Sequence, residues 1–260
     1  MVRVDEVFRT LLVDAGNTRL KWSWLQDGQR SEQQARIYAD GMDKVSAAQA
    51  ILTELLHDTD TRRMILVHVL GDDFSHGVEQ LCQLIHCQLS LVSGTTATYG
   101  IKLAYPNPAH LGADRLVGLA AARSLAGHKA AIIIDCGTAV TVDAITADSV
   151  HLGGLITPGL GLLQDALFRR TQAKHMDKSL VDNPQIFTDN TAAAIGSGCL
   201  FSLVGTIEGI CQRMQDQMTE QPLKIICGGD AARLHEWLRG DFMLRPAALM
   251  DGLQAIAEYE

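Results

Sequence analysis

The pattern of apolar and polar residues predicts a chain in which strands come first and then alternate with helices, and it does so twice. In the first half, an apolar run ending at Val13 precedes an alternating run at 20–25, as expected for two strands joined by a tight turn. Apolar residues within 43–57 recur at helical spacing. The second half opens with an apolar run at 130–134, which ends in three β-branched isoleucines, and repeats the order. The pattern therefore predicts two α/β lobes of similar topology.

The boundaries follow from where each pattern begins and ends. We expect further strands at 36–38, 64–69, 89–92, 140–145, 150–155 and 223–227. We expect helices at 43–57, 73–85, 112–125, 160–171, 191–218, 231–238 and 249–258. The division falls in the helix 112–125 and the loop after it, which gives an N-terminal lobe 1–127 and a C-terminal lobe 128–260. A ligand would bind in the cleft between two such lobes.

Two of the predicted hairpins turn at an aspartate followed by glycine. Residues 14–18 read Asp-Ala-Gly-Asn-Thr, and residues 135–138 read Asp-Cys-Gly-Thr. Glycine lacks Cβ, so backbone N–H groups and the hydroxyl of Thr18 or Thr138 can close on phosphate oxygens. The aspartate can then hold Mg²⁺ or its waters against those oxygens. Either turn alone could be an ordinary strand turn with a capping aspartate, but two copies behind apolar strands favour a phosphate site.

A segment between the halves carries the next candidate residues. Tyr105 is followed by two prolines, and then Gly112, Ala113, Asp114 and Arg115 open an alanine-rich helix. Asp114 could stabilise the helix dipole, or its carboxylate could accept a proton from a substrate hydroxyl. Arg115 could bind an anionic group.

Three further segments allow a functional and a plain structural interpretation. The glycine-rich stretch 153–159 precedes a helix and could approach a ligand or simply turn. Thr191 could contact a substrate or act as the N-cap of the long helix. The turn 227–230 could approach the adenosine of a nucleotide or link a strand to a helix.

Composition narrows the class of protein. The chain has 260 residues, 47% of them hydrophobic, and a formal charge of -8 without a block of basic residues, which argues against a nucleic-acid surface. No apolar stretch is expected to span a membrane, and the first ten residues lack a secretory signal. These features predict a cytoplasmic protein. The absence of a G-x-x-x-x-G-K-[ST] motif argues against a P-loop kinase.

The six cysteines are scattered without C-x-x-C spacing, so we expect reduced, buried thiols. Cys82, His86 and Cys87 lie close together, but the helix that carries them offers no second half of a metal site.

Taken together, these motifs resemble type III pantothenate kinases, a family that includes proteins first named Bvg accessory factors. The resemblance rests on residues 14–21, 112–115, 135–143, 153–159 and 190–191, which come in the family's order and approximate spacing. It implies the two-lobed α/β fold of acetate and sugar kinases, Hsp70 and actin, which is ribonuclease H-like, with the active site in the cleft. It also implies a homodimer that uses ATP to phosphorylate the primary hydroxyl of pantothenate, the first step of coenzyme A synthesis.

The resemblance assigns expected roles to individual residues. Tyr105, Gly112, Ala113, Asp114 and Arg115 would bind pantothenate, with Asp114 as the proton acceptor. The ATP phosphates would lie on Asp14, Ala15, Gly16, Asn17, Thr18, Arg19, Leu20, Lys21 and Thr138.

Two more roles concern the second half of the chain. Thr191 would add a contact to pantothenate, and Asp135 would bind a monovalent cation, K⁺ or NH₄⁺. Mg²⁺ would accompany ATP. Two alternatives stay open: a kinase of the same fold that acts on another small molecule, and a nucleotide-binding regulator without catalysis. The presence of Asp114 and both turn aspartates favours the enzyme.

Overall fold

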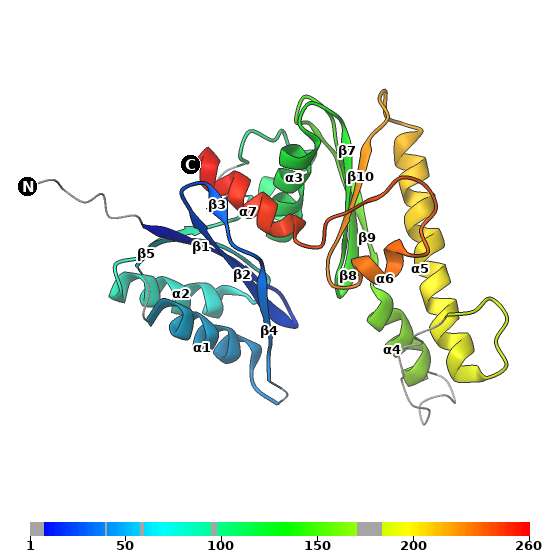
Figure 1. The fold of residues 1–260 in the computed structure, drawn as a ribbon, viewed down its shortest axis with the longest axis horizontal. Coiled ribbons are helices and arrows are strands. Elements are labelled where there is room, and N and C mark those ends of the chain that lie inside the picture. The colour runs from blue at the N-terminus through cyan, green and yellow to red at the C-terminus, as the bar shows by residue number, and fades with distance from the viewer. Residues whose placement is uncertain (1–7, 40, 58–59, 95–97, 171–183) are drawn as a thin grey trace, which may run out of the picture. The chain divides into compact units, whose positions relative to one another are not determined.

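The computed structural model describes residues 8–39, 41–57, 60–94, 98–170 and 184–260 (Figure 1). The chain forms two compact units, Met1–Leu125 together with Leu249–Glu260, and Ala126–Ala248. The expected lobes are 1–127 and 128–260, whereas the contacts of the structure assign the C-terminal helix to the first unit.

The first unit contains a sheet built around β1 (Arg9–Ala15). β1 pairs antiparallel with β2 (Arg19–Gln26) on one side and parallel with β5 (Thr61–His68) on the other. The sheet order is β3-β2-β1-β5-β6, with β4 also paired to β2. The remaining strands are β3 (Gln29–Arg30), β4 (Gln34–Ile37) and β6 (Gln88–Leu91).

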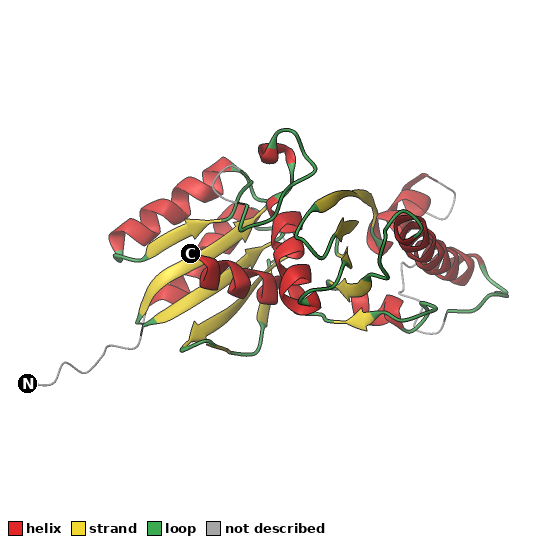
Figure 2. Ribbon diagram, turned by 90° about the horizontal axis from the view of Figure 1, so that it is seen from above, coloured by secondary structure: helices red, strands yellow, loops and turns green. Residues whose placement is uncertain are grey.

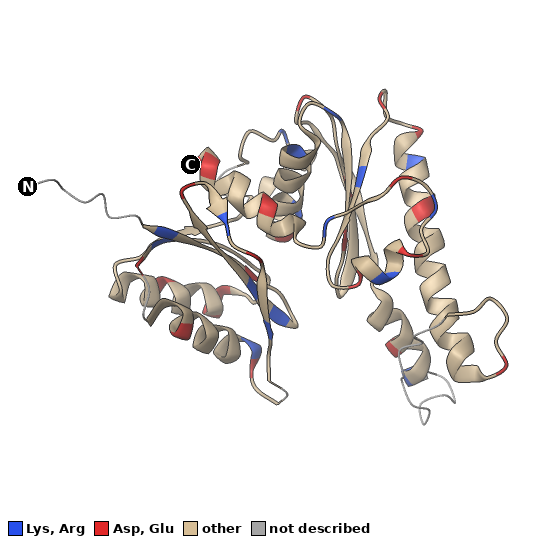
Figure 3. Cartoon of the chain, in the orientation of Figure 1, with Lys and Arg blue, Asp and Glu red and all other residues tan. Residues whose placement is uncertain are grey.

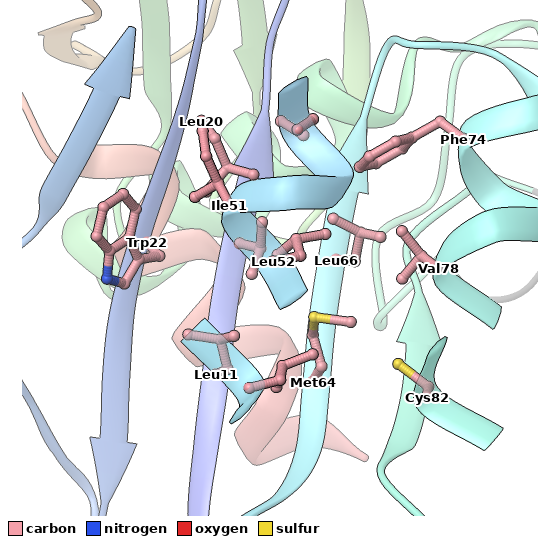
Figure 4. Packing of buried hydrophobic residues seen from close by; sticks show 14 of the residues in the cluster. Leu11, Leu20, Trp22, Ile51, Leu52, Met64, Leu66, Phe74, Val78 and Cys82 are labelled. Atoms are coloured by element: carbon pink, nitrogen blue, oxygen red, sulfur yellow. The ribbon is translucent and has the colours of Figure 1, made fainter. Parts of the chain in front are cut away.

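One face of this sheet is covered by α1 (Lys44–His57) and α2 (Asp72–Leu84). Their apolar stripes meet the inward-facing residues of β1, β2 and β5 in one core (Figure 4). Ile51 and Leu52 of α1 and Phe74 and Val78 of α2 are among its buried members. The helical spacing seen in the sequence therefore corresponds to a buried helix face, as amphipathic helices require.

The C-terminal helix α7 (Ala248–Tyr259) is held in the first unit by polar and backbone contacts. Asp251 forms an ion pair with Arg30 of β3, and Arg63 of β5 donates from Nη1 to the Ala257 carbonyl oxygen at 3.1 Å. A Cβ at Gly252 would overlap the Val117 carbonyl oxygen, so α7 approaches α3 (Ala113–Ala126) backbone to backbone. These partners are far from α7 in sequence, which is why the order of elements alone misplaced it.

The second unit repeats the arrangement around β7 (Ala131–Cys136). β7 pairs antiparallel with β8 (Ala139–Ile145) and parallel with β10 (Leu223–Cys227), and the order is β11-β10-β7-β8-β9. β9 is His151–Pro158 and β11 is Met243–Leu244. Figure 2 shows the strands of both sheets in yellow. The prediction of two α/β lobes of similar topology is confirmed.

The helices of the second unit are α4 (Leu160–Arg170), α5 (Thr191–Gln215) and α6 (Ala231–His235). α5 packs Leu200, Leu203 and Ile207 into the core of this unit. The helix spans 25 residues, its most apolar window has a mean hydropathy of 1.5, and 44% of that window is buried. The statement that no segment could span a membrane is therefore wrong by length and composition for α5, although a buried core helix has the same profile.

Gly153 and Gly154 lie within the strand β9 and not in a loop. The expected strand 150–155 extends to Pro158, and Gly153 adopts φ +112° where the pairing of β8 and β9 shifts register. A Cβ at Gly154 would overlap the Asp143 carboxylate. Asp143 Oδ1 lies 2.9 Å from Nε2 of His151, and both side chains are almost completely buried. Gly154 therefore leaves room for a buried acid–imidazole pair.

We expect His151→Ala to destabilise the second unit, because it leaves the Asp143 carboxylate buried without its imidazole partner. Loss of one partner of a buried pair costs about 3 kcal/mol. The free energy of unfolding from urea titrations measures the change. Asp148→Ala, at an exposed position on the same hairpin, is the matched control and should change stability by under about 0.5 kcal/mol. Equal effects of the two substitutions would contradict a structural role for the pair.

Candidate active site

The first aspartate–glycine turn joins β1 to β2 and holds Asp14 at the end of a buried strand. Asp14 is 7% exposed, and its Oδ2 accepts a hydrogen bond from Nζ of Lys21 at 3.0 Å. The residues are opposed because β1 and β2 pair in that register. Since an unpaired charge away from water is costly, the ion pair is what allows a carboxylate at this depth. The strand pairing thus fixes both charges beside the turn.

The same turn divides the predicted phosphate-binding residues into two groups. Ala15 and Leu20 are fully buried in the core, so only their backbone is available to a ligand. Asn17 and Thr18 are exposed. Among the residues that the structure describes, a Cβ at Gly16 would meet only the Arg19 carbonyl oxygen, at 3.5 Å, which is ordinary contact. The turn therefore has room for a ligand beside its glycine.

Tyr38 lies against this turn and was missed by sequence reasoning. Its N–H donates to the Thr18 carbonyl oxygen at 3.1 Å, and its hydroxyl is buried without a hydrogen-bond partner among the described residues. Burial, and then the charge of Asp14, raise the pKa of the phenol. The contact arises because β4 pairs with β2, with Ile37 opposite Arg19. No local sequence signal marks it, because it depends on a strand pairing.

Tyr105 and Arg115, both predicted to bind substrate, are brought together. Nη1 of Arg115 donates to the Tyr105 hydroxyl at 2.8 Å, and the guanidinium carbon lies 5.6 Å from the ring centroid. Arg115 is 6% exposed, whereas Tyr105 is partly exposed. Asn107 accepts the Ala109 N–H and so caps the short 3-10 helix η1 (Pro108–His110) between them. The segment before α3 is therefore a structured turn.

Asp114 occupies the first turn of α3, where its Oδ1 accepts the backbone N–H of Arg115 at 2.8 Å. A Cβ at Gly112 would lie 2.6 Å from the same oxygen, so glycine makes room for this orientation of the carboxylate. Ala113 precedes it as the first helical residue. The helix N-terminus favours a negative charge at this position, and Asp114 is partly exposed. The structure thus presents a fixed, accessible carboxylate beside a buried guanidinium.

The second aspartate–glycine turn joins β7 to β8 and is braced by two other loops. Gly159 donates its N–H to the Thr138 carbonyl oxygen at 3.0 Å, and Asp230 donates to the Cys136 carbonyl oxygen at 3.0 Å. Gly228 has φ +96°, and a Cβ there would overlap Asp135 Oδ1 and the Cys136 carbonyl oxygen. Gly228 therefore makes its close approach to the chain's own second turn.

Thr191 begins α5 but is not its N-cap. Asn190 has extended backbone angles, and its side chain accepts the Ala193 N–H at 2.9 Å. The N-cap interpretation of Thr191 is therefore wrong. The Thr191 side chain is exposed at the first helical position, with its hydroxyl not required for capping.

Comparison with known proteins identifies the family. The family model described as type III pantothenate kinase matches residues 10–213. The chain belongs to the type III pantothenate kinase family. Relatives with this name include one from Nitrosococcus oceani, 32% identical with 95% of this chain and 93% of that protein covered. Another, from Moorella thermoacetica, is 32% identical with 95% and 98% covered.

Solved structures show the fold expected for the family. A protein from Campylobacter jejuni described as a Baf family transcriptional activator superposes with a TM-score of 0.61 at 17% identity, covering 95% of this chain and 98% of that one. An archaeal actin homologue, Ta0583, gives 0.54 at 13% identity, with 96% and 99% covered. These likenesses confirm the actin-like, two-lobed α/β class.

We expect Gly228→Ala and Gly16→Ala to differ in their effect on folding. An alanine at 228 adopts a strained backbone and overlaps the second turn, which costs about 2 kcal/mol. An alanine at 16 meets only ordinary contact and should change stability by under about 1 kcal/mol. Urea unfolding of both variants measures the difference. A Gly16→Ala variant as unstable as Gly228→Ala would show that the first turn is filled by the protein itself.

Proposed function

We propose that this protein transfers the γ-phosphoryl group of ATP to the primary hydroxyl of pantothenate, the first committed phosphorylation of coenzyme A synthesis. The observation that carries the proposal is the fixed carboxylate of Asp114 beside Arg115, in a chain of the type III pantothenate kinase family. The relatives at about a third identity carry this activity in their names. The reaction takes place in the cytoplasm, and six buried, unbridged cysteines fit such a reducing compartment.

The phosphates of ATP bind at the first turn. The open side of Gly16 and the exposed Asn17 and Thr18 suit an anion, because backbone N–H groups and a hydroxyl can reach phosphate oxygens there. Lys21, which is paired with the Asp14 carboxylate, supplies positive charge beside the turn. Thr138 contributes a second phosphate contact from the other turn. Phosphoryl transfer depends mainly on such positioning and charge balance.

Asp14 also fits the demands of Mg²⁺. This cation keeps several waters and is bound by one or two carboxylates together with substrate phosphates, so a single buried carboxylate beside an open turn is a suitable donor. When bound, Mg²⁺ neutralises charge on the phosphate oxygens. No group of three or more His, Cys, Asp or Glu side chains in the described ranges forms a separate metal cluster.

Pantothenate binds at the turn before α3 and at its first residues. The Arg115 guanidinium, held over Tyr105, pairs with the carboxylate of the substrate. The Asp114 carboxylate accepts the proton of the primary hydroxyl as the oxygen attacks the γ-phosphorus. Gly112 and Ala113 keep the backbone close to the substrate, and Thr191 adds a contact through its exposed hydroxyl.

Asp135 binds a monovalent cation, K⁺ or NH₄⁺, through a carboxylate held beside Gly228. The enzyme works as a homodimer. Support comes from the exposed small residues Gly198, Ser202 and Gly205 of α5, which offer a face for close helix packing. Basic and acidic residues are interspersed over both units (Figure 3), which suits a small-molecule substrate rather than nucleic acid.

A coupled assay of ADP release with ATP, Mg²⁺ and pantothenate tests the reaction. We expect ADP release that requires pantothenate and that falls when Na⁺ replaces K⁺, because Na⁺ fits the Asp135 site less well. Folded protein that releases no pantothenate-dependent ADP in either salt would overturn the proposal. Activity with another small alcohol or acid would identify a kinase of the same fold, and nucleotide binding without turnover would identify a regulator.

Asp114→Asn should lower kcat by at least roughly a hundredfold, because the amide cannot accept the hydroxyl proton. The ADP-release assay at saturating pantothenate measures kcat. Asp72→Asn is the matched control, since Asp72 is also a carboxylate in the first turn of a helix. Both variants lose a favourable dipole interaction of about 0.5 kcal/mol, but only Asp114→Asn should lose turnover. Near-normal kcat in Asp114→Asn would remove this carboxylate from proton transfer.

A further inference from the structure

The end of α2 has the geometry of a Schellman motif. His86 adopts φ +56°, and its N–H donates to the Gln83 carbonyl oxygen at 3.3 Å. The N–H of Cys87 donates to the Cys82 carbonyl oxygen at 2.9 Å. These two bonds satisfy the last carbonyls of the helix, and the motif requires a left-handed residue at the position of His86. The helix therefore ends in a tight reversal that leads into β6.

The motif brings two cysteines together. In a Schellman motif, the residue three positions before the C-cap lies against the residue that follows the left-handed one. The two side chains normally make an apolar contact. Here these residues are Cys82 and Cys87. Both side chains are buried in the core of the first unit, where each thiol lies close enough to the other to shift its pKa. The backbone geometry that terminates the helix thus places two cysteine thiols near each other, and we call this pair the dithiol.

The two thiols are not equivalent. A hydrogen bond that the Cys82 thiol can donate to a thiolate at Cys87 lowers the pKa of Cys87, while the neighbouring Cys87 and burial raise the pKa of Cys82. Burial raises the pKa of Cys136 and of Cys211, which lie in the core of the second unit. Because the thiolate is the nucleophile, the dithiol has a more reactive member in Cys87.

The dithiol lies just under the surface. Leu84 is 79% exposed, and His86 and Gln88 on either side of Cys87 are also exposed. Opening the reversal after α2 would uncover Cys87, because the residues on either side of it are already exposed.

We propose that Cys82 and Cys87 form a reversible oxidation site that takes a low-molecular-weight disulfide as its oxidant. The Cys87 thiolate attacks one sulfur of the disulfide, forming a mixed disulfide and releasing one thiolate. Cys82 then loses its proton, and its thiolate attacks Sγ of Cys87 and displaces the second thiolate. Two protein thiols are oxidised, the added disulfide is reduced to two thiols, and the new bond links the end of α2 to the start of β6.

The experiment equilibrates the reduced, folded protein with 2-hydroxyethyl disulfide, alkylates the remaining thiols in denaturant and digests with trypsin. The sequence places Cys82 and Cys87, without any other cysteine, in the tryptic peptide 64–102. We expect this peptide to carry no alkyl group and to be lighter than the reduced, unalkylated peptide by two hydrogen atoms. Reduction with dithiothreitol followed by alkylation should then add both labels. Circular dichroism during the incubation verifies that the protein stays folded.

Two variants make the result specific. Cys199→Ser removes a buried cysteine of α5 and should leave the internal disulfide unchanged. Cys82→Ser should trap the mixed disulfide on Cys87, since no second thiol can displace it. Full alkylation of both cysteines in folded wild-type protein under excess disulfide would overturn the proposal. A cross-link that forms only in denaturant, or one that joins other cysteines, would overturn it as well.

Discussion

The register between a buried central strand and its antiparallel partner is the constraint on which both aspartate–glycine turns depend. β1 is apolar from Leu11 to Val13, and pairing with β2 places Lys21 directly opposite the Asp14 carboxylate. A slip of one residue would turn Leu11 and Val13 away from the core. The burial of the strand therefore determines where the charge of the turn lies. In the second unit, β7 pairs with β8 in the same manner and sets Asp135 opposite Thr141.

The parallel neighbours complete each turn. The Val69 N–H, just past β5, donates to the Ala15 carbonyl oxygen at 3.3 Å, and the loop after β10 supplies the Asp230 N–H to Cys136. In a parallel pair, both strands end at the same edge, so loops distant in sequence meet there. The repeated topology thus explains why two unrelated stretches of sequence carry similar turns. It also explains why the candidate residues Asp14 and Asp135 both lie at the carboxyl ends of the central strands.

Local pattern was sufficient for the hairpins, the helices with an apolar face and the two similar sheets, because each is encoded by neighbouring residues. It was insufficient for α7, whose partners Arg30 and Arg63 lie some two hundred residues away, and for Tyr38, whose contact with the first turn depends on the pairing of β4. The motif residues of the candidate site could be named from the sequence. The atoms that lie next to each glycine could not be predicted, because they come from other strands and loops. Gly154 and Gly228 make room for Asp143 and Asp135, whereas a Cβ at Gly16 would be in ordinary contact with the Arg19 carbonyl oxygen.

The difference between the surroundings of the two aspartate–glycine turns indicates that they bind different ligands. The second turn is held by the backbone N–H groups of Gly159 and Asp230, and Gly228 can be nothing larger without moving Asp135. A site held from several sides suits a structural cation, which needs fixed oxygen ligands. The first turn has an open glycine and a carboxylate already paired with Lys21, so an incoming phosphate can share the lysine without creating an unpaired buried charge. In the proposed reaction, the first turn is therefore the main site for the ATP phosphates, which must bind and leave in each cycle, while Thr138 of the second turn adds one contact.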